Sequence, residues 1–360
     1  MRLHSLLLLP LLAFGLIGCK EDTAPADQAA APAQSFHWKM VTTWPKNAPG
    51  TGTAAERLAE RVNAMSGGRL TIKVYAAGEL VPALEVFDAV SRGTAELGHG
   101  TPYYWKGKVP AAQFFGAVPF GLSTLEMNAW LSKGGGQALW DEAYAPFGLK
   151  PLTAGNSTMQ MGGWFNKEIN SLDDIRGLKI RMPGLGGEVW SRLGATTVVM
   201  PGGEIFTALQ TGAIDATDWV SPYNDLAFGL HKAARYYYYP GWQEPQSVLE
   251  LLINQKAYDA LPADLQAIVT EAARAATQDM MDDYVFHNAQ ALDELKKGGT
   301  LLKRFPDEVL QAMQRESEQV LGELAAQSEL NGRIWTSMQA FQALATSMHT
   351  LSEKELYDWR

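Results

Sequence analysis

The chain has 360 residues, of which 46% are hydrophobic, so it is long enough for the cores of about two globular domains. Its formal net charge of −9 argues against a nucleic-acid-binding protein, which normally carries a basic surface. The single cysteine excludes an intrachain disulfide.

The N-terminal segment has the pattern of an export signal. Arg2 precedes an apolar run, Leu6 to Ile17, that is too short to span a bilayer. The run leads into Gly18-Cys19, which is similar to a bacterial lipoprotein cleavage site. We expect residues 1–18 to be a signal peptide and Cys19 to carry a lipid anchor, so that the protein is periplasmic and tethered to a membrane. An ordinary signal cleaved near Ala24 is the alternative. Residues 19–35 are rich in Ala, Pro, Gln and Asp, which predicts a flexible, lipid-anchored tether.

The body of the chain alternates predicted strands and helices, which indicates an α/β fold. In the first half we expect strands at 36–43, 69–75, 95–100 and 152–156, and helices at 54–65, 82–92, 125–131 and 136–144. The pattern restarts with strands at 178–182 and 197–200 and helices at 188–193 and 204–211. The two runs predict two α/β lobes. Residues 262–297 are free of Gly and Pro after Pro262, which predicts one long helix across both lobes, and 307–328 form another helix.

Several familiar catalytic and metal-binding motifs are missing from the sequence. There is no HExxH, CxxC, GxSxG or GxxxxGK[ST] pattern, so a zinc site, a serine-hydrolase elbow and a P-loop are poorly supported. The segment Gly184 to Val189 begins like a dinucleotide-binding loop but lacks the third glycine. We interpret it as a tight turn that exposes Arg181. Asp282-Asp283 fit a solvated helix face or a contact with the N-terminal lobe.

Arg181 lies near the end of the predicted strand Leu178 to Met182, and strand ends facing a crevice are where α/β proteins bind ligands. Arginine grips a carboxylate with two parallel hydrogen bonds and stays charged. An ordinary surface salt bridge is the alternative role.

Three further segments combine polar groups with aromatic residues: 156–164, 215–225 and 236–245. Carboxylates among bulky aromatics are costly to bury unless they are paired or bind a metal. Core aromatics beside exposed acids are the simpler interpretation. In 156–164, Gln160 is expected on a strand that crosses between the lobes.

These segments, in this order, resemble the solute-binding proteins of tripartite ATP-independent periplasmic (TRAP) transporters, from about Phe36 to the C-terminus. The most specific matches are Ile180 to Gly184, Asp218-Trp219 with Pro222 to Asp225, and the tyrosine run into Pro240-Gly241-Trp242 with Glu244. The chain looks like the branch that takes 2-oxo and 2-hydroxy monocarboxylates, such as pyruvate or lactate, with a bound cation.

The resemblance implies a two-lobed, type II-like periplasmic binding protein fold with a long helix spanning both lobes. We expect lobe I at 36–153 plus 244–291, and lobe II at 154–243 plus 292–360. The implied role is a receptor and not an enzyme: it closes around a small organic acid anion and delivers it to TRAP membrane permease subunits. In this branch the C-terminal helices can be exchanged between subunits, so one expectation is a homodimer. The alternative is a chain whose C-terminal helices only complete one of its own lobes.

The resemblance also implies the roles of individual residues. Arg181 would grip the carboxylate, and the ligand would be lined by Tyr103, Tyr104 and Asn156, together with Gln160 and Trp219. A Ca²⁺ or Na⁺ ion would be held by Gln160, Asp218, the Trp219 backbone carbonyl and Glu244. At Ser221, Gln243 and Gln246 the sequence departs from the family's pattern.

The implied ligand set is chemically consistent, because carboxylate, amide and carbonyl oxygens suit Ca²⁺ or Na⁺ better than zinc or copper. Asp218 and Glu244 against Arg181 leave one net negative charge, which would repel a bare carboxylate. Ca²⁺ would make the site net positive and Na⁺ would make it neutral, so the charge balance favours Ca²⁺ slightly.

Two alternatives remain from the sequence. One is a metal-independent receptor for another organic acid, such as a dicarboxylate, a sugar acid or an amino acid. The other is an exported metal-assisted lyase or hydrolase that uses Asp218 and Glu244 as acid and base. Against an enzyme, no histidine falls in the key segments and no nucleophile–base pair is evident.

Overall fold

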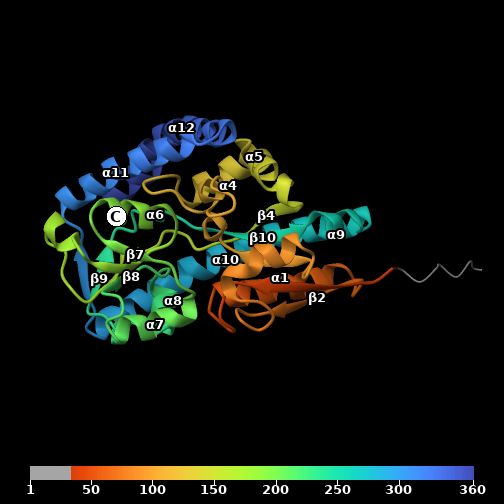
Figure 1. Ribbon diagram of the computed structural model, residues 1–360, viewed down its shortest axis with the longest axis horizontal. Coiled ribbons are helices and arrows are strands. Elements are labelled where there is room, and N and C mark those ends of the chain that lie inside the picture. The colour runs from red at the N-terminus through yellow and green to blue at the C-terminus, as the bar shows by residue number, and fades with distance from the viewer. Residues whose placement is uncertain (1–33) are drawn as a thin grey trace, which may run out of the picture. The chain divides into compact units, whose positions relative to one another are not determined.

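The computed structural model describes residues 34–360, which contain two mixed β-sheets with helices around them (Figure 1). The α/β class that the sequence predicts is therefore confirmed. The expected signal peptide, the lipid anchor at Cys19 and nearly all of the expected tether lie outside the described residues.

The first sheet has the strand order β2-β1-β3-β10-β4. β1 pairs in parallel with β2 and β3, whereas β10 runs antiparallel to β3 and β4. The sequence pattern does not predict β10, because nearly all of its residues are buried and the pattern shows no alternation. The strands are β1 (Phe36–Thr42), β2 (Leu70–Tyr75), β3 (Leu97–Gly100), β4 (Leu149–Asn156) and β10 (Val248–Asn254).

The second sheet has the order β11-β9-β5-β8-β6-β7. β6 pairs in parallel with β7 and β8, and β5 runs antiparallel to β8 and β9. The tyrosine run of the sequence is β9, which pairs in parallel with β11. The strands are β5 (Gly163–Phe165), β6 (Lys179–Arg181), β7 (Thr196–Val198), β8 (Ala216–Thr217), β9 (Tyr236–Tyr239) and β11 (Leu301–Arg304).

Helices connect and cover the strands. Those of the first half are α1 (Thr51–Met65), α2 (Val86–Ser91), α3 (Ala112–Gly116), α4 (Thr124–Lys133) and α5 (Gly136–Tyr144). They are followed by α6 (Gly184–Arg192), α7 (Gly202–Gln210), α8 (Pro222–Ala227), α9 (Gln255–Asp259) and α10 (Ala263–Lys297). The C-terminal part forms α11 (Asp307–Ala326), α12 (Glu329–His349), a π-helical segment (Thr350–Lys354) and α13 (Glu355–Asp358). Short 3₁₀ turns include η2 (Pro102–Trp105), which carries two expected site residues.

The long helix α10, of 35 residues, confirms the expected helix at 262–297. Leu265 and Val269 from its first half pack into the core of the first sheet. Met280 and Leu295 from its second half pack with Trp164 in the core of the second sheet. The helix therefore contributes side chains to both cores. Asp283, near its middle, forms an ion pair of 3.3 Å with Arg57 of α1, which fits the expected contact with the N-terminal part of the fold.

The chain passes between the two sheets along 157–162, along 240–247 and along α10. The first two crossings carry Gln160 and Glu244, and the other expected site residues lie at or just after the ends of β3, β4, β6 and β8. These segments meet where the two sheets adjoin. The boundaries of the two lobes stay a prediction.

The C-terminal helices contact both halves of the fold. α11 packs against α6, and α12 packs against α4 and α5. Trp335 of α12 stacks on Phe114 with ring centroids 5.9 Å apart, and Arg333 pairs with Glu142 at 2.8 Å. Within residues 34–360, no helix is both long and apolar enough to cross a membrane.

Candidate functional site

Arg181 ends β6, and its side chain is almost completely buried. Its guanidinium donates to the backbone carbonyl of Asp218 at 2.8 Å and to the Tyr104 hydroxyl at 3.3 Å. Two weaker contacts of 3.4 Å reach the carbonyl of Met200. The guanidinium carbon also lies 5.5 Å from the centre of the Trp219 ring. The backbone and aromatic contacts therefore hold a buried positive charge without a carboxylate bonded to it.

The prediction that a tight turn exposes Arg181 is wrong, because only 1% of the Arg181 surface is accessible to solvent. Gly184 instead begins helix α6, with a positive φ of 62°. A Cβ on Gly187 would clash with the carbonyl oxygen of Met182. The glycine at position 187 therefore lets the first turn of α6 pack directly onto the backbone that follows β6. The groups that contact the buried guanidinium are Tyr104, Trp219 and the carbonyls of Met200 and Asp218.

Asp218 follows β8 and is also buried, at 1% exposure. Its Oδ1 accepts a hydrogen bond of 3.3 Å from the Gln243 amide, whereas its Oδ2 has no partner among residues 34–360. Burial raises the pKa of the Asp218 carboxyl to about 6, although the charge of Arg181 opposes this shift.

Glu244 lies on the second crossing and is 4% exposed. Its Oε2 accepts from the Gln160 amide at 2.7 Å and from the Tyr103 hydroxyl at 3.3 Å. Burial raises the pKa of Glu244 well above its usual value, and the nearby charge of Asp218 raises it further. Two buried carboxylates therefore repel each other across this site, and Arg181 is the cation that opposes both shifts.

The donors present at the site fit a hard cation. Oδ2 of Asp218 and Oε1 of Gln160 are both buried oxygens without a hydrogen-bond partner in the described part of the chain. That part holds no cluster of three or more His, Cys, Asp or Glu side chains arranged for a metal. A cation here would therefore need amide and carbonyl oxygens beside the two carboxylates, which is chemistry suited to Ca²⁺ or Na⁺.

A small cavity of about 10 Å³, roughly the space for one water, lies among these groups. Four of the expected residues line it: Tyr103, Tyr104, Gln160 and Trp219. Arg181 and Glu244 do not line the cavity themselves but are hydrogen-bonded to residues that do. Arg181 bonds to Tyr104, and Glu244 bonds to Tyr103 and Gln160. The structure thus brings together the guanidinium, both carboxylates and the aromatic walls around a small cavity.

Asn156 lies close by but does not line the cavity. Its side-chain nitrogen donates to Gln246 at 2.9 Å, and its side-chain oxygen accepts from the backbone N–H of Thr158 at 2.9 Å. Both ends of the amide are therefore engaged within the protein.

The lining also includes residues that the sequence did not single out: Trp44, Thr51, Ser157, Val220, Ser247 and Leu249. Trp44 closely follows β1, the same strand-end position that drew attention to Arg181, so the strand-end rule could have found it. Trp44 donates to His99 Nδ1 at 2.7 Å, and the buried His99 bonds the carbonyl of Ala154 at 3.3 Å. Burial lowers the pKa of His99 to about 4, so this imidazole is neutral at pH 7.

Asp225 and Glu250 are two further buried carboxylates, and both lie outside the cavity. Asp225 of α8 accepts from Trp164 at 3.0 Å and from the Tyr237 hydroxyl at 2.6 Å, and burial raises its pKa to about 7. Glu250 of β10 accepts from Trp105 and Tyr144, and burial raises its pKa to about 8.

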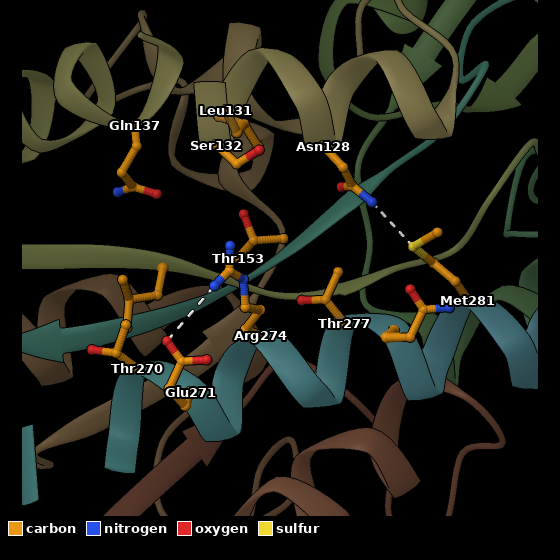
Figure 2. Close-up of a pocket in the computed structure, with 12 residues that line it drawn as sticks. Asn128, Leu131, Ser132, Gln137, Thr153, Thr270, Glu271, Arg274, Thr277 and Met281 are labelled. Atoms are coloured by element: carbon orange, nitrogen blue, oxygen red, sulfur yellow. Dashed lines mark hydrogen bonds and ion pairs between the residues drawn. The ribbon is translucent and has the colours of Figure 1, made fainter. Parts of the chain in front are cut away.

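A larger groove of about 600 Å³ lies between α4, β4 and α10, as Figure 2 shows. Threonine and amide side chains line much of it, with the ion pair of Glu271 and Arg274 at 3.7 Å. None of the expected site residues lies in this groove, and both members of its ion pair are well exposed. The small cavity between the sheets is therefore the candidate binding site.

Two α/β halves joined by crossing segments, with a carboxylate buried on one crossing and an arginine and a second carboxylate buried at the ends of neighbouring strands, are the architecture of two-lobed extracytoplasmic solute-binding proteins. The chain belongs to the family of bacterial extracellular solute-binding proteins, family 7 (DctP), whose model matches residues 40–328. This confirms the resemblance that the sequence motifs indicate.

Individual relatives agree with this family. The chain is 44% identical, over 94% of its length and 92% of the relative's, to a monocarboxylate 2-oxoacid-binding periplasmic protein of a Nostoc species. It is 40% identical to a TRAP periplasmic solute-binding protein from Pseudoalteromonas atlantica with bound sodium and pyruvate, with a TM-score of 0.88 and coverage of 90% of this chain and 99% of the other. It is also 40% identical to one from Colwellia psychrerythraea with bound calcium and pyruvate, with a TM-score of 0.89 and coverage of 91% and 100%.

Proposed function

We propose that this chain is the extracytoplasmic solute receptor of a TRAP transporter and binds a small 2-oxo or 2-hydroxy monocarboxylate of the pyruvate and lactate class. In this proposal a Ca²⁺ or Na⁺ ion assists binding, and the loaded receptor delivers the anion to membrane permease subunits. The observation that carries the proposal is the buried pair Asp218 and Glu244, whose like charges are opposed by a single arginine.

The charge balance explains why a cation and an anion would bind together. Two ionised carboxylates and Arg181 leave one net negative charge in a buried site, and such a charge is costly without a counter-ion. A cation held by Asp218, Glu244, Gln160 and the Trp219 carbonyl would supply positive charge for the ligand's oxygens. The guanidinium of Arg181 would then bind the carboxylate, exchanging its present contact with Tyr104 or Met200 for the ligand.

The relatives support the ligand class. Pyruvate accompanies sodium in one structure and calcium in another, and the Nostoc relative is named for binding 2-oxoacids. Neither cation is preferred by these comparisons.

The mechanism is binding and closure, with no bond broken. The two sheets and their helices would act as lobes that separate to admit the ligand, since the cavity has room for about one water and is smaller than pyruvate. In the closed state Tyr104, Trp219 and Trp44 exclude water, which strengthens the ionic contacts around Arg181. Contacts from both halves, such as Tyr104 with Arg181, would favour the closed state that the permease recognises.

We also propose the location and assembly that the sequence indicates. Cys19 would anchor the receptor in a membrane through lipid, with residues 19–35 as the tether. A homodimer is supported by the apolar residues exposed at the C-terminus, where Leu351 is 80% and Trp359 is 83% exposed. A similar protein from Bordetella bronchiseptica, 36% identical, was crystallised as a dimer with copurified calcium and picolinate.

Pyruvate binding measured with and without cations tests the proposal. Chelator-treated protein should bind pyruvate weakly, and adding Ca²⁺ or Na⁺ should restore binding and raise the melting temperature. Arg181→Ala should abolish this ligand-induced stabilisation. Full-affinity pyruvate binding in the absence of both cations would support the metal-independent receptor instead, and turnover of pyruvate observed by NMR would support the exported lyase.

A further inference from the structure

Asp225 is a buried carboxylate that the proposed binding mechanism does not use. It lies in the first turn of α8, which follows the loop 218–221 that carries two of the four proposed cation ligands, Asp218 and the Trp219 carbonyl. Its side chain is 1% exposed and accepts three hydrogen bonds. Oδ2 accepts from Trp164 at 3.0 Å and from Tyr237 at 2.6 Å, and Oδ1 accepts from the backbone N–H of Val220 at 3.3 Å.

The hydrogen bond from the Val220 N–H to Asp225 also fixes the direction of the Trp219 carbonyl. The N–H of Val220 and the carbonyl of Trp219 belong to the same planar peptide unit, in which the two groups point in opposite directions. A side chain that holds the N–H on one face of the loop therefore directs the carbonyl to the opposite face. Among residues 34–360, no protein hydrogen bond is donated to this carbonyl, whereas the preceding carbonyl, of Asp218, accepts from Arg181 at 2.8 Å.

From this geometry we infer that Asp225 is a positioning residue for the cation site: it orients the Trp219–Val220 peptide so that the Trp219 carbonyl faces the cation. This inference rests on the proposed function, in which that carbonyl is a ligand. The hydrogen bonds from Trp164 of β5 and Tyr237 of β9 hold the carboxylate in place. These two strands pair within the second sheet, so the sheet fixes the orientation of the peptide through Asp225.

A purely local role does not account for all of these contacts. An acidic side chain near a helix start often reaches back to a free backbone N–H, which would explain Oδ1 alone. It does not require Oδ2 to be buried between an indole N–H and a phenol O–H from two strands of the sheet. Partners of this kind, one shell behind a metal ligand, typically change metal affinity by about 10-fold to 100-fold when they are altered.

The test compares Asp225→Asn with a matched control, Glu250→Gln. Glu250 is an equally buried carboxylate that accepts from a tryptophan and a tyrosine, but it lies in the first sheet and its hydrogen bonds go to Trp105 and Tyr144, not to the loop 218–221. Calorimetric titration of Ca²⁺ into chelator-treated protein, with pyruvate at saturation, should show affinity at least about 10-fold weaker for Asp225→Asn and within about 2-fold of wild type for Glu250→Gln.

A second readout reports on the peptide itself. In NMR spectra of isotope-labelled protein, Ca²⁺ should shift the Trp219 carbonyl carbon of the wild type and of Glu250→Gln, and this shift should shrink in Asp225→Asn. If Asp225→Asn does not fold, Tyr237→Phe removes one of the hydrogen bonds that hold the carboxylate and should weaken Ca²⁺ binding by at least about 3-fold.

The outcomes separate the inference from the function on which it rests. If the wild type binds Ca²⁺ and pyruvate together but Asp225→Asn, or Tyr237→Phe in its place, binds Ca²⁺ as tightly as the wild type, Asp225 has only a structural role and the inference is overturned. If the wild type binds neither Ca²⁺ nor Na⁺ in the presence of pyruvate, the proposed function itself fails.

Discussion

Replacing Asp218 by asparagine should change how the stability of the cation-free protein depends on pH. The pKa of Asp218 is raised from 3.8 to about 6 in the folded chain. A carboxyl with a raised pKa binds its proton more tightly when folded than when unfolded. Its contribution to stability is therefore fully present below pH 3.8 and is lost as the pH rises through about 6.

The magnitude follows from the shift. About two pKa units correspond to roughly 3 kcal/mol, of which roughly 2 to 3 kcal/mol is lost between about pH 4 and about pH 8. The amide that Asp218→Asn introduces cannot ionise, and the loss of a negative charge at this position also relieves Glu244, whose pKa Asp218 raises. The free energy of unfolding of Asp218→Asn minus that of wild type should therefore increase by at least this amount over the same pH range.

Urea denaturation in the presence of chelator, at several pH values, measures this difference. A constant offset from altered hydrogen bonding cancels, because only the change with pH is compared. Excess Ca²⁺ should remove the advantage of the variant at about pH 8, since the ion binds the ionised wild-type pair and stabilises the folded state. Parallel stability curves for the two proteins across this pH range would refute the assignment of Asp218 as a buried, strained carboxylate.

Two further predictions test the aromatic wall and the control carboxylate. A Cβ on Gly202 would clash with the Trp219 ring, so Gly202→Ala should displace that ring and weaken pyruvate binding about 10-fold. In the control Gly203→Ala the added Cβ would lie 3.9 Å from Pro45, and this variant should bind pyruvate normally. Equal affinities of the two variants in calorimetry would contradict this packing. Glu250→Gln should gain roughly 2 to 3 kcal/mol of stability relative to wild type between about pH 6 and about pH 9. The reason is that the pKa of Glu250 is raised to about 8, so the stability contributed by its protonated form is lost from the wild type as the pH rises through that value. A pH-independent difference in the free energy of unfolding would exclude a buried, protonated Glu250.

The sequence predicts local structure well where one signal dominates. The helix at 262–297 follows from a long segment without Gly or Pro, and β1 and β2 follow from short runs bounded by turn residues. The tyrosine run stands out in the sequence as an unusual segment, yet its pairing as β9 between β5 and β11 depends on residues distant in the chain.

The features that the sequence does not predict are non-local. β10 carries Glu250 within an apolar run, and only the tertiary contacts with Trp105 and Tyr144 explain how that carboxyl is buried. Similarly, Thr51 and Ser247 are far apart in sequence and meet only at the cavity. The prediction that a glycine turn exposes Arg181 is wrong, because Tyr104 and Trp219, which are distant from Arg181 in the sequence, pack against its guanidinium.

The central claim is that a cation held by Asp218, Glu244, Gln160 and the Trp219 carbonyl acts with Arg181 to bind a small carboxylate. A crystal structure of the protein grown with Ca²⁺ and pyruvate tests it most directly. We predict an anomalous calcium peak about 2.3–2.6 Å from oxygens of these four residues, and the pyruvate carboxylate within hydrogen-bond distance of the Arg181 guanidinium. Pyruvate bound elsewhere, or bound at this cavity with Arg181 turned away and no ion between Asp218 and Glu244, would contradict it.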